Sequence, residues 1–288
     1  MLESIGTGVW RVAAARGEPT PANGGATAQL VLAIEGDRLW LIGTGPTPAF
    51  GTALACSIEQ STGRHVTDVI VTRAAPELAM GNLAFAGARL WALPDVIEAM
   101  RARCGQCMAR SRARLGAAGE SLLDEAIRVP DSGIGAAHQT PGRIGPFEWL
   151  GVERAPGEHL LVLKLTIPHA SPLVIAQGLL WPGDVPDLHD TQSVAMLTSL
   201  RALQAFAGNA RLLGEQGDIA QPAEIGRHID YIESLQSAVR GHLARGDVQG
   251  AAGSEVDLPA FSALPGYALR HPLNVQHVWR ELEPEVFR

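Results

Sequence analysis

One pair of cysteines has a spacing that could bind a metal ion or form a disulfide. Cys104 and Cys107 are three residues apart, so on a helix they lie one turn apart on the same face. A zinc site needs two further ligands, and neither a second C-x-x-C nor a pair of histidines follows at a suitable spacing. The pair also falls in the middle of a predicted helix, whereas a thioredoxin-like motif begins one. We therefore expect both side chains to pack against neighbouring elements.

The densest group of potential metal ligands lies between residues 159 and 190. It consists of His159, His169, Asp184, Asp187, His189 and Asp190. No histidine in the chain belongs to an H-x-H or H-E-x-x-H motif. Because metal ligands usually have fixed local spacings, a fortuitous group of loop residues is the favoured interpretation. A zinc hydrolase that uses this group stays open as an alternative.

Motifs for phosphate binding and for a serine nucleophile are weak or missing. The segment GTGPTP at residues 43–48 lies between a predicted strand and a predicted helix, but it lacks both G-x-G-x-x-G and the lysine of a P-loop. No G-x-S-x-G occurs, which argues against an α/β-hydrolase. We therefore expect no cofactor.

Composition limits the classes of partner. The 288 residues are 46% hydrophobic and 18% charged, which suits one large α/β domain with a sizeable core. The net charge of −7 argues against a nucleic-acid partner. A local basic run is predicted to be the solvated face of a helix. It consists of Arg101, Arg103, Arg110, Arg112 and Arg114.

The cellular compartment is predicted from cysteine usage and from apolar runs. Three cysteines, the third being Cys56, cannot form a disulfide framework, and an odd number is typical of a reducing compartment. The first residues include Glu3 and no long apolar run, unlike a signal peptide. No window approaches the ~18 apolar residues of a membrane span. We expect a cytoplasmic protein with no membrane partner.

Hydrophobic periodicity predicts strands and helices alternating along two halves of the chain. Strands are expected at residues 8–14, 28–34, 38–42, 67–72, 88–93, 147–154, 159–166, 172–181 and 210–214. Helices are expected at residues 48–62, 77–86, 94–115, 119–127, 190–207, 222–245 and 274–285. This order suggests two packed sheets with helices outside them.

Four segments together resemble the metallo-β-lactamase superfamily, and in particular its branch associated with sulfur oxidation and quinoprotein relay systems. They are LWLIGTGPTPAFG, TDVIVTRAAPELAMGNLAFAG, LLWPGDVPDLHD and ARLLGEQGD. The second segment matches the family's T-H-x-H-P-D-H-x-x-G-N-x-A-F without a gap at Thr72, Pro76, Gly81, Asn82, Ala84 and Phe85. The resemblance covers nearly the whole chain. It implies an α/β fold, a four-layer αββα sandwich, as a single domain over 1–288 with a helical tail at 222–288 packed on it.

At the positions where the resemblance implies zinc ligands in the second motif, this chain has other residues. The two histidines of H-x-H are replaced by Arg73 and Ala75, the aspartate by Glu77, and the adjacent histidine by Leu78. Arginine brings a fixed positive charge, and leucine and alanine have no lone pair to donate. We therefore expect Arg73 to pair with Glu77 or another carboxylate in place of the metal.

The remaining family ligand positions are replaced as well. The aspartate of the family's V-I-D-T-G corresponds to Gly43, and the histidine of P-G-H-G to Gln216. The third-motif histidine falls at Ala155 or Pro156, where the match is loose. For the family's G-D, Gly183-Asp184 keeps the letters, but Gln177-Gly178 keeps the spacing and is preferred. The resemblance therefore implies a degenerate member with no metal and no catalytic residue.

The expected function is non-catalytic binding of an unknown small molecule or protein in the old cleft, by Arg73, Glu77, Gln177 and Gln216. The alternative is a hydrolase with a non-standard or residual-metal site, for instance with Glu77 as the base and Arg73 as an electrostatic stabiliser. The apolar helical tail also makes a homodimer possible.

Overall fold

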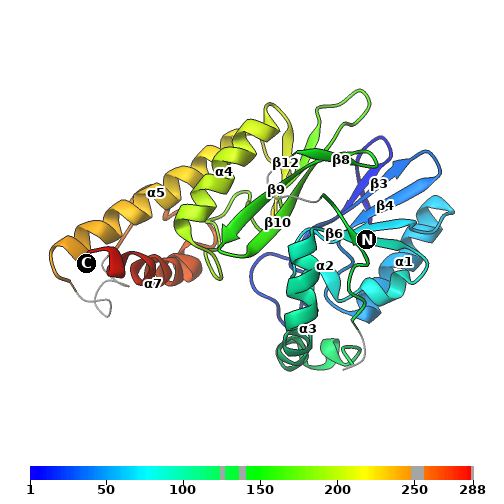
Figure 1. Cartoon of the computed structure of the whole chain (residues 1–288), viewed down its shortest axis with the longest axis horizontal. Coiled ribbons are helices and arrows are strands. Elements are labelled where there is room, and N and C mark those ends of the chain that lie inside the picture. The colour runs from blue at the N-terminus through cyan, green and yellow to red at the C-terminus, as the bar shows by residue number, and fades with distance from the viewer. Residues whose placement is uncertain (124–126, 136–140, 248–255, 287–288) are drawn as a thin grey trace.

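The computed structural model describes residues 1–123, 127–135, 141–247 and 256–286. Two β-sheets pack face to face, and helices cover the outer face of each sheet (Figure 1). The expected four-layer αββα sandwich, as a single domain ending in C-terminal helices, is confirmed. No helix in the described ranges is long and apolar enough to cross a bilayer.

The first sheet contains seven strands in sequence order. They are β1 (Glu3–Gly6), β2 (Val9–Val12), β3 (Leu30–Glu35), β4 (Arg38–Ile42), β5 (Asp68–Ile70), β6 (Arg89–Ala92) and β7 (Ser132–Gly133). The strands from β1 to β4 form an antiparallel meander, and those from β4 to β7 are parallel. Since the carboxyl ends of parallel strands meet at one edge, the loops after β4 and β5 lie together there.

The second sheet contains five strands in the order β12-β11-β10-β9-β8. They are β8 (Gly142–Ile144), β9 (Phe147–Ala155), β10 (Glu158–Leu165), β11 (Leu173–Ile175) and β12 (Arg211–Leu213). The pairing is antiparallel from β8 to β11, and β12 runs parallel to β11. The loops after β11 and β12 therefore emerge at the same edge.

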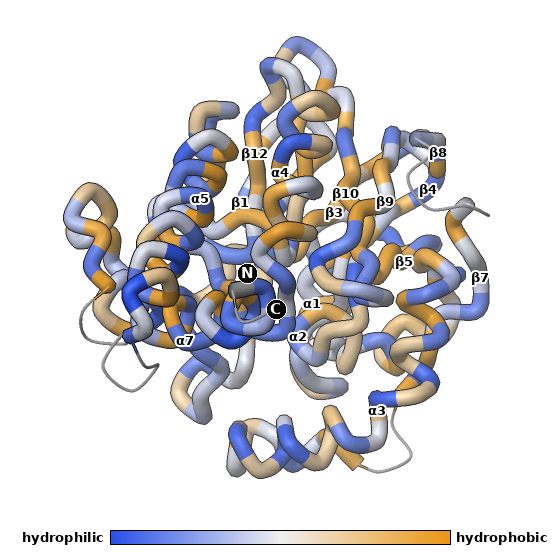
Figure 2. Tube along the Cα trace, turned by 60° about the vertical axis from the view of Figure 1, so that its left-hand side comes forward, coloured by the Kyte–Doolittle hydropathy of each residue, from blue (hydrophilic) through white to orange (hydrophobic). Residues whose placement is uncertain are grey.

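Successive side chains of β10 point alternately to its two faces, and each face belongs to a different hydrophobic core. Leu161, Leu163 and Leu165 face the core between the sheets, whereas Leu160 and Val162 face the core under the outer helices. This is the period of two that a strand buried on both faces requires. In Figure 2 the central strands are accordingly hydrophobic, while the helices alternate between hydrophobic and hydrophilic residues.

The helices divide between the two outer layers. Those of the first half are α1 (Pro48–Thr62), α2 (Pro76–Ala79) and α3 (Pro94–Leu115), with 3₁₀ turns at Asn82–Phe85 and Gly116–Gly119. Those of the second half are α4 (Ser193–Ala207), α5 (Ala223–Ala244) and α7 (Tyr267–Val286), with a 3₁₀ turn at Pro259–Phe261. The bounds of α1 and α3 match the predicted ones, because each begins at a proline and ends before a glycine.

Four predicted elements differ from the structure. The helix expected at 77–86 is one helical turn followed by a 3₁₀ turn, because the loop bends at Gly81. The strand expected at 172–181 ends at Ile175, where the chain turns. The last helix was expected to begin at residue 274. It begins instead at Tyr267 and continues through Pro272. The helix predicted at 119–127 lies partly outside the described residues.

Candidate functional site

The loop after β5 is held at the edge of the first sheet by hydrogen bonds that do not involve its charged residues. The backbone oxygen of Thr72 accepts a hydrogen bond from the Leu161 amide at 2.8 Å, which ties the loop to β10. Asn82 is fully buried, and its side-chain oxygen accepts a hydrogen bond from the Thr44 hydroxyl at 2.8 Å. These contacts position residues 73–79 whether or not a metal ion is bound.

Leu78 fills the space below this loop. It is fully buried, and its Cδ2 lies 2.9 Å from the point that a β-carbon on residue 43 would occupy. Gly43 has a φ of +74°, so a side chain there would be both strained and blocked. The leucine side chain thus occupies the space that a side chain at residue 43 would need.

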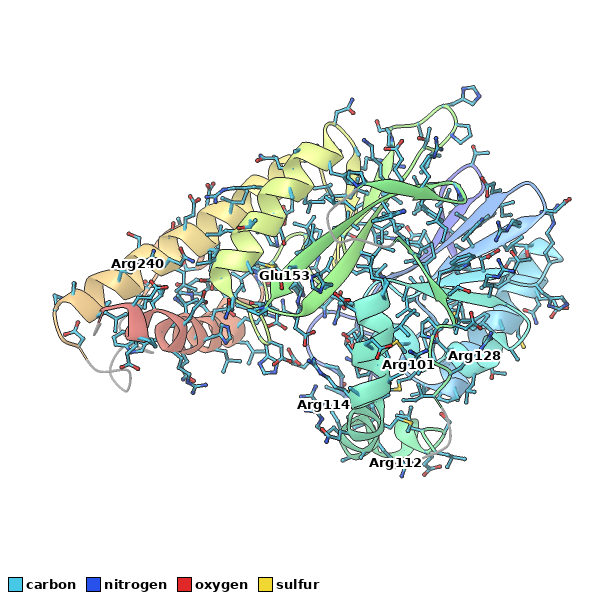
Figure 3. The ribbon with its side chains drawn as sticks, viewed as in Figure 1. Arg101, Arg112, Arg114, Arg128, Glu153 and Arg240 are labelled. Carbon is cyan, nitrogen blue, oxygen red and sulfur yellow. The ribbon has the colours of Figure 1, made fainter. Side chains whose placement is uncertain are left out.

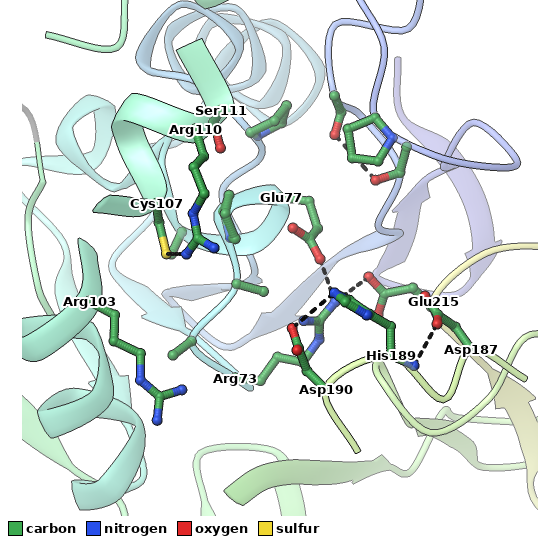
Figure 4. Close-up of a pocket in the computed structure, with 18 of the residues that line it drawn as sticks. Arg73, Glu77, Arg103, Cys107, Arg110, Ser111, Asp187, His189, Asp190 and Glu215 are labelled. Carbon is green, nitrogen blue, oxygen red and sulfur yellow. Dashed lines mark hydrogen bonds and ion pairs between the residues drawn. The ribbon is translucent and has the colours of Figure 1, made fainter. Parts of the chain in front are cut away.

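Arg73 is the centre of an ion-pair network at the edge of the sandwich. Its Nη2 lies 2.5 Å from Glu77 Oε1 and 2.7 Å from Glu215 Oε1, so the expected partner Glu77 is confirmed and a second carboxylate joins it. Glu215 Oε2 accepts a hydrogen bond from the Gly178 amide at 2.8 Å. The side chains are mostly buried, with exposed fractions of 17% for Arg73 and 5% for Glu215. Three distant segments are therefore locked together (Figure 4).

Burial and charge shift the pKa values in this network. Burial opposes the charge of Arg73, but the Glu215 and Glu77 carboxylates outweigh it and raise the Arg73 pKa further. The pKa of Glu215 is raised because burial penalises its ionised form, and the nearby Glu77 carboxylate adds to the shift. One guanidinium faces two carboxylates, so these three groups carry one negative charge in excess when all are ionised.

Arg154, at the end of β9, supplies a second guanidinium that the sequence did not reveal. Its Nη1 lies 3.2 Å, and Arg73 Nε lies 3.0 Å, from the point that a β-carbon on Gly178 would occupy. Arg154 directly precedes Ala155 and Pro156, the two positions to which the resemblance loosely assigns the third-motif histidine. Burial, followed by the neighbouring charge of Arg73, lowers the Arg154 pKa. No carboxylate of the described residues forms an ion pair with it.

Beside this network lies a cleft of about 1090 Å³. One wall is α3, with Cys104, Cys107 and Arg110, and the opposite wall is the loop of residues 187–192. Figure 4 shows Cys107, Arg110 and Ser111 on α3, across the cleft from Arg73 and Asp190. The cleft is large enough for a small organic molecule.

The α3 arginines are only partly the solvated face that was expected. Arg101 and Arg114 are mostly exposed, and the basic side chains spread along the helix (Figure 3). Arg103, Arg110 and Arg114 nevertheless line the cleft. Cys104 packs partly against the core, and burial, with the neighbouring Cys107 thiol, raises the pKa of Cys104 to about 11.

The predicted binding residues divide between the cleft wall and the interior. Arg73, Glu77 and Gln216 line the cleft. Gln216 exchanges two hydrogen bonds with the Gly17 backbone, at 2.9 and 2.8 Å. Gln177 does not line the cleft: it is fully buried and is hydrogen bonded to the Thr72 hydroxyl and the Gln29 carbonyl oxygen. Its amide group is used to join the two sheets.

The structure separates the group of histidines and aspartates between 159 and 190. Asp184 is buried against Arg270 of α7, and His169 lies in an exposed turn. His159 lines the cleft, where its Nδ1 lies 2.7 Å from Asp95 Oδ2. Among the described residues, no three His, Cys, Asp or Glu side chains gather closely enough to hold a metal ion. In the described part of the chain the six residues are thus dispersed over separate places.

Residues missed by sequence reasoning come from segments far away in the chain. Glu215 and Arg154 join the network from β12 and β9, and Arg270 reaches the cleft from the tail. The sequence does indicate Glu215, because the polar pair Glu215-Gln216 directly follows a predicted buried strand. Arg154 and Arg270 carried no comparable signal.

No family model matches the sequence, and no curated protein matches it. Solved structures do. A metallo-β-lactamase from Hirschia baltica superposes with a TM-score of 0.62 at 14% identity, covering 81% of this chain and 96% of that one. FIM-1 from Pseudomonas aeruginosa, in its mono-zinc form, gives 0.62 at 14% identity, with 81% and 94% covered. A metallo-β-lactamase from Erythrobacter litoralis gives 0.60 at 16%, with 81% and 95% covered. The chain therefore has the metallo-β-lactamase fold.

Proposed function

We propose that this protein binds a small molecule in the cleft of a metallo-β-lactamase fold without hydrolysing it. The observation that carries the proposal is the position of Arg73 between Glu77 and Glu215, where its cation is held by two carboxylates. In this reading, Arg73 takes the place that zinc has in the family which the sequence resembles. The chain would then be a degenerate member of that family.

The donor set supports this proposal because it does not fit zinc. Zinc sites in proteins are built from imidazole, thiolate and carboxylate groups arranged tetrahedrally. Here the two carboxylates already contact a guanidinium, which is a cation itself, and Leu78 has no donor atom. A zinc ion beside Arg73 would therefore meet electrostatic repulsion and too few ligands.

The alternative, a hydrolase with a non-standard site, has one supporting observation. The close contact between His159 and Asp95 on the cleft wall is the arrangement that orients a histidine for acid–base chemistry. Glu77 is less suitable as a base, because Oε1 already contacts Arg73. A metal-free hydrolase of this kind would depend on His159.

Metal analysis and turnover assays test the non-catalytic part of the proposal. Protein purified without chelator is incubated with zinc, desalted and measured by mass spectrometry for metals. We expect far less than one zinc per chain, and no turnover of β-lactam, ester or thioester substrates above buffer. Stoichiometric zinc with turnover would refute the proposal. Turnover without metal that is lost in His159→Ala would establish the alternative.

A neutral fluorescent probe tests the binding part. N-phenyl-1-naphthylamine fluoresces in apolar surroundings and is small enough for the cleft. We expect saturable binding to the unmodified protein. Ala99→Trp would fill the cleft from the exposed side of α3, since Ala99 lines it and is half-buried, and should abolish the signal. If the tryptophan variant binds the probe as well as the unmodified protein does, the cleft is not the binding site.

A further inference from the structure

We propose that the cleft selects a small organic anion, a carboxylate or sulfonate on an apolar body, and that Arg154 is the residue that recognises its charge. This inference rests on the proposed function, because it assumes that the cleft takes a small molecule. It adds the chemical class of the ligand and the residue responsible.

The first step is the unequal pairing of the arginines that line the cleft. Arg73 contacts Glu77 and Glu215, Arg103 contacts Glu158, and Arg270 contacts Asp184. The two remaining cleft arginines, both on α3, are exposed: Arg114 lies 3.9 Å from Glu18, and Arg110 donates to the Cys107 sulfur. Arg154 instead donates only to backbone oxygens, those of Gly178 at 3.4 Å, His189 at 3.3 Å and Asp190 at 3.4 Å. These are long hydrogen bonds to neutral acceptors. Its charge is thus left for a partner that the described part of the chain does not provide at ion-pair distance.

The second step is a buried donor beside Arg154. The Nε–H of Arg73 is buried and has no hydrogen-bond partner among the described residues. It lies on the same side of Gly178 as Arg154 Nη1. A buried donor without an acceptor is unfavourable, because it has lost its hydrogen bonds to water. An anionic oxygen drawn toward Arg154 would approach both donors, and charge-assisted hydrogen bonds of this kind are among the strongest.

The third step is the character of the other cleft residues. The carboxylates that act on Arg154 are already engaged elsewhere: Glu215 contacts Arg73, Glu158 contacts Arg103, and Asp187 accepts a hydrogen bond from the His189 amide at 2.9 Å. Apolar wall is provided by Ala74, Met80 and Met100. A ligand with an anionic head at Arg154 would lay its apolar body along this wall. A strongly hydrophilic anion such as inorganic phosphate would leave the wall unused.

Two probes with the same aromatic body test the inference. The anion 8-anilinonaphthalene-1-sulfonate carries a sulfonate that N-phenyl-1-naphthylamine lacks. We expect the unmodified protein to bind the sulfonate at least about 10-fold more tightly. Arg154→Gln should remove this preference and leave binding of the neutral probe unchanged. Arg154→Lys, which keeps a charge but not the planar fork, should keep part of it.

A matched control is Arg128→Gln. Arg128 is also partly buried and donates to backbone oxygens, those of Phe85 and Ala88. It differs in lying outside the cleft and in having a carboxylate, that of Asp131, at 3.5 Å. It should keep the preference, provided that thermal unfolding shows a folded variant. If the two probes bind equally well, or Arg154→Gln keeps the preference, the inference is wrong while the binding cleft stands. If neither probe binds, the proposed function itself fails.

Discussion

Arg73 and Arg154 approach the same glycine from different sheets, but the protein treats their charges in opposite ways. Arg73 is enclosed by two carboxylates, and Arg154 contacts only carbonyl oxygens. The first arrangement satisfies a buried cation within the chain. The second keeps a cation at the edge of a cleft with no carboxylate of the described residues at ion-pair distance. We infer that Arg73 serves mainly the stability of the fold and that Arg154 serves binding.

The largest effect is expected for Arg73→Met, which keeps the length of the side chain and removes its charge. Glu77 and Glu215 would then face each other without a cation, and breaking a buried pair in this way costs about 3–5 kcal/mol. Urea unfolding measures the loss. The control is Arg201→Met, since Arg201 pairs with Glu233 at 2.5 Å with both side chains about half exposed, and it should cost about 1 kcal/mol or less. Equal losses in the two variants would contradict a stabilising role for the Arg73 network.

The next effect concerns pH. Because the pKa of Glu215 is raised in the folded protein, the folded state binds more protons than the unfolded state above the ordinary glutamate range. Stability from this group is therefore present at low pH and falls as pH rises through the raised value. In Arg73→Met the lowering influence of the guanidinium on the Glu215 pKa is lost, so the fall in stability should be larger and should extend to higher pH. A variant whose stability relative to the unmodified protein is the same at pH 5 and pH 8 would argue against this coupling.

The smallest effect is expected for Arg154→Gln on stability. Three long hydrogen bonds to loop carbonyls are lost, and those near His189 and Asp190 can be replaced by water, so we expect a loss of about 1 kcal/mol or less. The same urea unfolding experiment measures it. A loss as large as that of Arg73→Met would make Arg154 a structural clamp of the 187–192 loop and would remove the contrast between the two arginines.

Much of the fold could be predicted from sequence because it depends on local patterns. The bounds of α1 and α3 follow from prolines and glycines at their ends, and the two-sheet order follows from the periodicity of the strands. The short loop helix could not be predicted as well. Its length depends on the contact between the Gly81 amide and the Gly45 carbonyl oxygen, which joins two separate loops.

The candidate site was predictable only in part, for a related reason. Arg73 and Glu77 are four residues apart in one loop, so their pairing could be expected from the sequence. Gln177 was expected in the cleft because its neighbour Gly178 occupies a ligand position in the resemblance, but in the turn after β11 its side chain points inward to Thr72. Whether Arg73, Glu77 and Gln216 bind a ligand stays a prediction.

The sequence by itself determined the kinds of residue available. It has an arginine and a glutamate where the zinc-binding loop of the resembled family has histidine and aspartate. Its hydrophobic pattern also determined that the strands around this loop are buried. Only the tertiary structure decided the partners of that arginine. Glu215 is 142 residues away from Arg73, and Arg154 is on another sheet. Their approach depends on how two sheets pack, which no local spacing encodes, and burial there decides which charges are paired.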